Sequence, residues 1–144
     1  MYKKEEYKLR QDIINKTNVM VDFYICSDNL NFKQITSLLR IQPSETRSKE
    51  TFKFKEFAKD YWSYLIEYEE SDDICNQINQ LIEVLLPRKK ELIFLLDNEP
   101  GIEMGFNVVI NVFDDVFPQL LLTSDVVNFF GELKCQIGFD IYTL

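Results

Sequence analysis

Apolar side chains recur at every second position in three segments of this chain, and the alternation limits the folds open to it. In residues 19–26 (VMVDFYIC) both valines, Phe23 and Ile25 fall on one face and the intervening residues on the other. A period of two is typical of a β-strand that buries one face. Residues 105–113 (GFNVVINVF) and 136–144 (QIGFDIYTL) repeat the pattern. We therefore expect a sheet with one apolar face.

Four other segments are candidate strands. The aromatic stretch 61–69 and the nearly all-apolar stretch 91–97 (ELIFLLD) predict strands, the second a central one in a hairpin with residues 105–113. Residues 117–122 predict a short fifth strand, and the lysines in residues 51–57 (TFKFKEF) suit a protected edge strand.

Three helices are expected to cover the apolar face. Asn31, Ser71 with the two aspartates after it, and Thr123 are placed to cap their first turns, and Pro43 and Pro87 end the first two. This order predicts an α+β fold, a ferredoxin-like two-layer sandwich whose mostly antiparallel sheet carries helices on one face. The matching alternation of the first and last strands suggests a pseudo-repeat of halves. With 144 residues, we expect a charged N-terminal arm or short helix at 1–17 and a single α+β domain at 18–144.

Charge is distributed unevenly along the chain. The net charge is −8, yet six of the 16 basic residues lie within residues 40–59 against three acidic ones, so that window is +3 and the remainder −11. Such acidity disfavours binding to nucleic acid or to an anionic membrane surface. It favours association with a basic protein.

Cysteine and histidine usage indicates a cytoplasmic protein without a metal or cofactor. The three cysteines are scattered and the chain has no histidine, so a zinc site would need an unusual ligand set. Three reduced thiols suit the cytoplasm. The N-terminal residues are charged where a signal peptide needs an apolar core, and no window is apolar enough to span a bilayer.

The sequence also lacks the usual equipment of an enzyme. Without histidine the commonest general base is missing, and four glycines form neither a dinucleotide-binding motif nor a phosphate-binding loop. The carboxylate pairs at 72–73 and 114–115 have simpler explanations, as a helix start and a loop. We therefore expect no catalysis.

The basic window at residues 40–59, which we call the basic segment, offers one candidate ligand site. Its hydroxyl and cationic side chains could hold an anion just beyond a helix end, although the interleaved glutamates and the helix dipole argue for a solvated connection instead. The residues concerned are Ser44, Thr46, Arg47 and Lys49.

Trp62 and Tyr64 are a second candidate contact, with Ile66 and Tyr68 expected on the same strand face. Aromatic side chains on a strand either pack in the core or anchor a protein interface, and both alternatives stay open.

Polar side chains on the opposite faces of the alternating strands predict an open sheet face that meets solvent or a partner. Asp140 stands out, because isoleucine and phenylalanine flank it. We expect it either to face solvent on the open side or to bond a buried hydroxyl such as that of Tyr24 or Tyr142. The set comprises Asp22, Tyr24, Asn107, Asn111, Asp140 and Tyr142.

Several of these motifs, in this order, resemble an uncharacterised bacterial family known only as a domain of unknown function. The resemblance covers residues 19–142. It begins with an opening strand and an acidic turn, and continues through LLRIQPSET, RSKE, YWSYLIEY, DICNQINQLIEVL and FDIY. Glu50 stands where the family usually has a glycine after the loop lysine. Similar domains look like immunity-type or accessory proteins encoded beside bacterial toxins, and the resemblance implies no activity.

Three hypotheses for function follow. The first is a non-catalytic, acidic protein-interaction domain, immunity-like or regulatory, that binds a basic protein through its open face. The second is a small-ligand or anion-binding domain, with enzymatic activity included, that has Thr46, Arg47 and Lys49 at its mouth and Trp62 beneath. The third is a structural oligomer. The chain would be a monomer or a homodimer.

Overall fold

The computed structural model describes residues 13–54, 56 and 58–144. The N-terminal arm expected at 1–17 falls largely on residues 1–12, outside the described residues. In chain order the elements are β1 (Asn18–Ser27), α1 (Phe32–Leu39), β2 (Glu45–Arg47), the 3₁₀ turn η3 (Lys49–Thr51), β3 (Asp60–Glu70), α2 (Ile74–Leu85), the 3₁₀ turn η5 (Leu86–Arg88), α3 (Lys89–Asn98), β4 (Glu103–Val112), α4 (Ser124–Glu132) and β5 (Gln136–Thr143).

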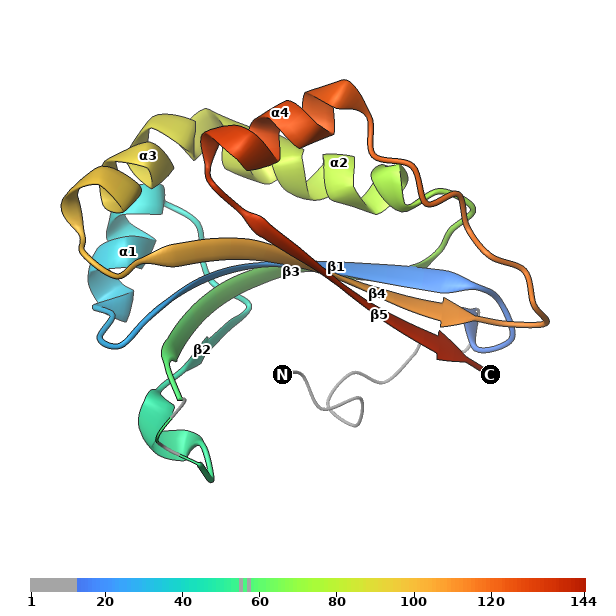
Figure 1. Cartoon of the computed structure of the whole chain (residues 1–144), viewed down its shortest axis with the longest axis horizontal. Coiled ribbons are helices and arrows are strands. Elements are labelled where there is room, and N and C mark those ends of the chain that lie inside the picture. The colour runs from blue at the N-terminus through green and yellow to red at the C-terminus, as the bar shows by residue number, and fades with distance from the viewer. Residues whose placement is uncertain (1–12, 55, 57) are drawn as a thin grey trace.

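One five-stranded sheet, in the order β2-β3-β1-β4-β5, forms one layer, and helices form the other (Figure 1). All neighbouring strands pair antiparallel except β4 and β5, which are parallel and joined through α4. The predictions of an α+β fold, a mostly antiparallel sheet and helices on one face are confirmed.

The ferredoxin-like order is not confirmed. Elements β1 to β4 follow the βαββαβ order with two successive helices, α2 and α3, in its second helical segment, but the chain then adds α4 and β5 to that order. The pairing also argues against a repeat of halves, because β1 and β3 are antiparallel neighbours while β4 and β5 are parallel ones.

The predicted helix starts hold to within two residues. Asn31 caps α1, where its Oδ1 accepts from the backbone N–H of Gln34 at 3.1 Å. The helix ends before Arg40, whose φ of 55° is left-handed, and so well before Pro43. Asp73, rather than Ser71, caps α2.

The strand predicted at residues 91–97 is wrong, because these residues lie within helix α3. Leu92 and Leu95, one helical turn apart, are buried while Phe94 between them is exposed. A short apolar run fits a buried strand or a helix equally well by period. The predicted hairpin with residues 105–113 is wrong for the same reason, since β4 pairs with β1 and β5.

Two shorter strand predictions are also corrected. Residues 117–122 form a loop that a single bridge between Asp73 and Gln119 ties to the start of α2. Residues 51–54 close η3 and then bend, and residues 55 and 57 lie outside the described residues. The strand on this edge of the sheet is β2, which has only three residues.

The main core lies between the helices and the sheet, and a β-bulge decides which β3 side chains reach it. Val19 pairs with Glu69 but Val21 pairs with Ile66, so β3 holds one extra residue there. Trp62, Tyr64 and Ile66 therefore face the helices, whereas Tyr68 turns to the opposite face and packs with Met20, Val109 and Ile13. The expectation that all four β3 side chains share a face is wrong at Tyr68.

Candidate functional site

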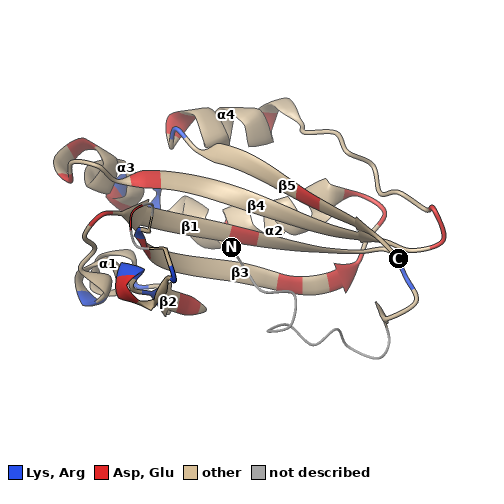
Figure 2. Ribbon diagram, turned by 60° about the horizontal axis from the view of Figure 1, so that its bottom comes forward, with Lys and Arg blue, Asp and Glu red and all other residues tan. Residues whose placement is uncertain are grey.

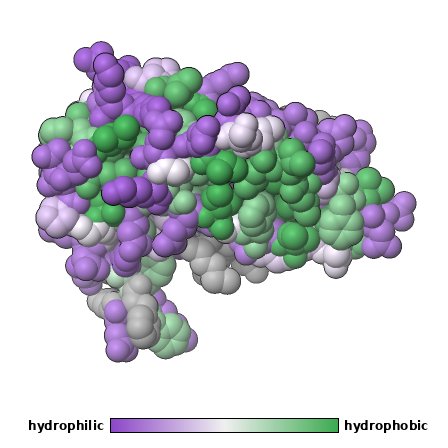
Figure 3. Space-filling model, turned by 45° about the horizontal axis from the view of Figure 1, so that its top comes forward, coloured by the Kyte–Doolittle hydropathy of each residue, from purple (hydrophilic) through white to green (hydrophobic). Residues whose placement is uncertain are grey.

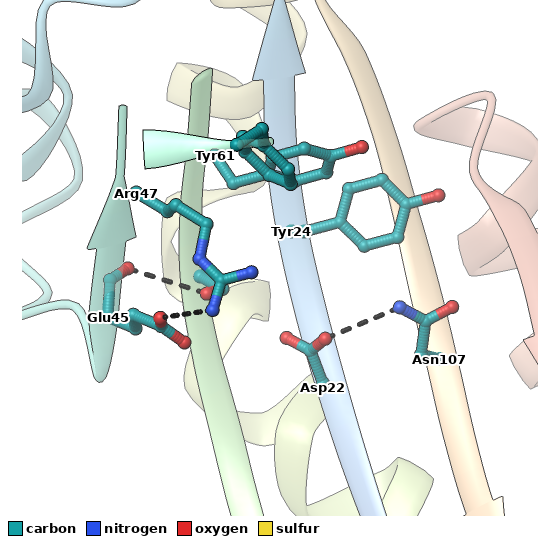
Figure 4. A pocket seen from close by; sticks show the side chains of 8 residues that line it. Asp22, Tyr24, Glu45, Arg47, Tyr61 and Asn107 are labelled. Atoms are coloured by element: carbon teal, nitrogen blue, oxygen red, sulfur yellow. Dashed lines mark hydrogen bonds and ion pairs between the residues drawn. The ribbon is translucent and has the colours of Figure 1, made fainter. Parts of the chain in front are cut away.

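A small hollow on the open face of the sheet, which we call the β2 cleft, gathers polar side chains from four strands (Figure 4). Its volume is about 30 Å³, enough for one or two water molecules. The lining residues are Asp22 and Tyr24 from β1, Glu45 and Arg47 from β2, Tyr61 and Ser63 from β3, Asn107 from β4, and Phe52.

Two glycines make room for this arrangement. A Cβ atom at Gly105 would collide with the ring of Tyr24, which lies across β4 at that point. A Cβ at Gly138 would lie 2.9 Å from Oδ1 of Asn107. The absence of these methyl groups lets Tyr24 and Asn107 lie flat against the sheet and line the cleft.

The charges in the cleft have partners within it. Nη2 of Arg47 lies 3.4 Å from Oε1 of Glu45, and the guanidinium sits 5.3 Å from the centre of the Phe52 ring. Nδ2 of Asn107 donates to Oδ2 of Asp22 at 3.4 Å. The Asp22 residue is fully buried.

The phenol of Tyr24 stays protonated at neutral pH. Burial, together with the charges of Cys26, Tyr61 and Asp22, raises its pKa to about 12. The cleft thus offers neutral hydroxyl and amide groups beside charges that are already paired. Small-molecule sites usually have volumes of about 300–1,000 Å³, so this cleft suits ordered water better than a metabolite.

The four candidate ligand residues of the basic segment do not converge. Arg47 lines the cleft, whereas Thr46 is exposed and lies on the opposite face of β2, where it pairs with Trp62. Oγ of Ser44 accepts from the backbone N–H of Leu65 at 3.1 Å, and Nζ of Lys49 donates to the carbonyl of Asp28 at 2.7 Å. Each of these two holds a loop in place.

Trp62 belongs to the core. It is fully buried, and its Nε1 donates to Oγ1 of Thr36 on α1 at 3.0 Å. Tyr64 is half-buried against the same helix-facing cluster. The two alternatives for these aromatic residues were core packing and an interface anchor, and in the structure they pack in the core.

The polar residues expected on an open face differ in burial. Asp22 and Asn111 are buried, and Asn111 donates to Oδ1 of Asn18 at 3.0 Å. Asp140 and Tyr142 are exposed on β5, near Tyr68. Burial, and next the charge of Tyr142, raise the pKa of Tyr68. The face therefore meets solvent chiefly at β5.

Asp60 is a structural residue that the sequence interpretation missed. Its buried carboxylate accepts from the backbone N–H of Leu30 at 3.0 Å and from that of Lys49 at 2.8 Å. It thereby ties the turn after β1 to the start of η3, which positions the basic segment. Only the folded chain brings these groups together.

A second missed feature is an exposed apolar area, which we call the β5 surface. It lies on the helix side of β5, next to α4 and the loop before it, and appears as a green region in Figure 3. Pro118, within the loop sequence VFPQLLL, disfavours a regular strand there because proline has no backbone N–H to donate. The exposed members are Val116, Phe117, Leu120, Leu121, Val127, Phe139 and Ile141.

The segment that carries the β5 surface is acidic. Residues 113–144 contain five carboxylates and a single basic residue, Lys134. Basic residues gather instead near β2 and η3, at the other edge of the sheet (Figure 2). In the described part of the chain, no three His, Cys, Asp or Glu side chains are placed to hold a metal ion.

Comparison with known families matches residues 15–144 to the one described as Domain of unknown function (DUF4279). No curated protein and no solved structure matches the chain. Among the described residues, none of the helices has the length and apolar character to cross a membrane.

Proposed function

The chain belongs to the DUF4279 family, whose description names no activity, and we propose that it is a non-catalytic protein-interaction domain that binds a basic partner protein. The observation that carries this proposal is the β5 surface, an exposed apolar area on an acidic segment of the chain.

Apolar side chains at the centre and polar ones at the rim are typical of protein interfaces. Phe139 and Ile141 are 45% and 47% exposed, although they lie on the face of the sheet that is otherwise covered by helices. Exposed apolar side chains gathered on one side of a small protein are typical of a place where another molecule docks.

Charge selects the partner. The five carboxylates of residues 113–144 would speed the approach of a basic protein and slow that of an acidic one. Such a domain would act by covering its partner, as an immunity-like or regulatory protein does. We propose a bacterial cytoplasmic setting, in keeping with three cysteines that are all free thiols.

The alternative of a small-ligand or anion site in the basic segment has less support. Arg47 already pairs with Glu45, and Lys49 bonds a backbone carbonyl away from the cleft. The β2 cleft that Arg47 lines measures about 30 Å³. A bound metabolite would require the cleft to open.

The test is affinity capture from a bacterial host lysate at about 50 mM and about 500 mM salt, followed by purification and titration of the captured protein. We expect a basic protein that is retained at low salt and released at high salt. Phe139→Glu should abolish capture. Phe94→Glu is the matched control, because Phe94 is 54% exposed on α3, outside the β5 surface. Equal capture by both variants, or capture that ignores salt, would contradict the proposal.

A further inference from the structure

Strand β5 offers an extended backbone edge. Its eight residues pair in unbroken parallel register with β4, and no other strand of the described residues pairs with it. Residues 139–143 are all exposed. The N–H and C=O groups that point away from β4 are therefore positioned to receive another strand.

Edge strands usually carry features that block such pairing, and in β5 the one such feature is the charge of Asp140. It contains no proline, no lysine and no bulge. The opposite edge of the same sheet is different: β2 is only three residues long, runs into the turn η3, and carries the Glu45–Arg47 ion pair. Of the two sheet edges in the described residues, the β5 edge is the one long enough to take up a strand of useful length.

The side chains of β5 specify what an added strand would carry. Phe139 and Ile141 lie on the helix side of the sheet, opposite Val108 and Ile110, and are only half covered. Asp140 projects from the other face. Residues directly across a strand pair share a face, so apolar residues suit the positions beside Phe139 and Ile141, and lysine or arginine suits the position beside Asp140.

A second copy of this chain is a poorer occupant. With five carboxylates and one lysine in residues 113–144, two copies would bring together surfaces of the same charge. A basic segment gains both the strand hydrogen bonds and charge complementarity.

We propose that β5 binds its partner by strand addition, and that the partner segment is extended, with apolar residues alternating with lysine or arginine. This inference rests on the proposed function, and names how that surface is occupied. Strand addition obtains affinity from main-chain hydrogen bonds and specificity from alternate side chains.

The first experiment uses a fluorescein-labelled nine-residue peptide that alternates isoleucine with lysine, titrated by anisotropy into the full chain. One control peptide has the same composition with its lysines grouped together. A second is N-methylated along its backbone and cannot donate strand hydrogen bonds. We expect each control to bind at least tenfold more weakly, and we expect the amide resonances of residues 136–143 to shift on binding.

The second experiment exchanges charge. Asp140→Lys should weaken the lysine peptide about fivefold or more and should create binding of a peptide that alternates isoleucine with glutamate. Asp125→Lys, on the first turn of α4, is the matched control and should leave the glutamate peptide unbound.

Equal binding of the N-methylated peptide, no response to Asp140→Lys, or a chain that sediments as a dimer whose β5 amides are protected would overturn strand addition. If these tests fail while capture of a basic protein still depends on Phe139, the interaction function stands and only the strand-addition mode is lost. If capture fails as well, both proposals fall.

Discussion

The contact between Trp62 and Thr36 provides a quantitative test of the fold, because it joins β3 to α1 through one buried hydrogen bond. Nε1 of Trp62 donates to Oγ1 of Thr36 at 3.0 Å, and the indole is fully buried. Complete loss of a buried aromatic ring costs about 3–5 kcal/mol. Trp62→Phe keeps a six-membered ring, so we expect roughly half of that, and about 1 kcal/mol more for the hydrogen bond. The expected loss is thus about 3 kcal/mol.

Thr36→Val removes only the acceptor and leaves the indole N–H buried without a partner, at a cost of about 1–3 kcal/mol. Each single variant breaks the same hydrogen bond, so the double variant loses it only once. The stability losses of the two single variants should therefore sum to about 1 kcal/mol more than the loss of the double variant. Urea unfolding followed by circular dichroism at 222 nm measures all four proteins. A loss below about 1 kcal/mol for Trp62→Phe, together with no coupling, would refute the placement of Trp62 in the core.

Three further predictions concern other positions. Asp60→Ala deprives two backbone N–H groups of their acceptor and should cost about 2–4 kcal/mol in urea unfolding, with Asp60→Asn intermediate because one amide oxygen remains. Gly105→Ala should cost about 1–3 kcal/mol in the same assay, since its methyl group would collide with Tyr24; Gly131→Ala, in α4 with open space around it, should instead stabilise the chain by up to about 1 kcal/mol. Burial raises the pKa of Cys135 to about 12, so the unfolded chain loses this proton first. Stability should therefore fall as pH rises above about 9, and Cys135→Ala should flatten that fall in denaturation curves measured from pH 8 to 11; an unchanged slope would contradict the assignment.

Local pattern predicted much of the fold. Period-two alternation located β1, β4 and β5, and Asn31 and Thr123 marked the starts of α1 and α4. These features depend on neighbouring residues alone, because alternation and capping act over a few positions of the chain.

Prediction from local pattern failed where a strand and a helix have the same local sequence pattern. The apolar run in 91–97 suits a buried strand as well as a helix, and its place after α2 and η5 in the helical layer decided the matter. The extra residue in β3 turned Tyr68 to the other face, and no alternation within β3 itself marks that position.

The candidate site was predictable only in part. Arg47 was singled out from charge, but its cleft depends on Asp22, Tyr24 and Asn107 from strands far away in sequence, and on the space left by Gly105. The exposure of Phe139 likewise follows from β5 being the last strand of the sheet, since a central strand with the same sequence would be covered.

The sequence by itself determined the α+β class, the acidic character, the lack of histidine chemistry and the positions of most elements, because composition, capping and period are properties of the chain and not of its packing. Only the tertiary structure decided that Trp62 is core, that the basic segment does not gather a ligand site, and that β5 lies exposed at the sheet edge. Those outcomes depend on strand order and on one bulge, and a strand order is selected by the burial of the whole apolar surface at once.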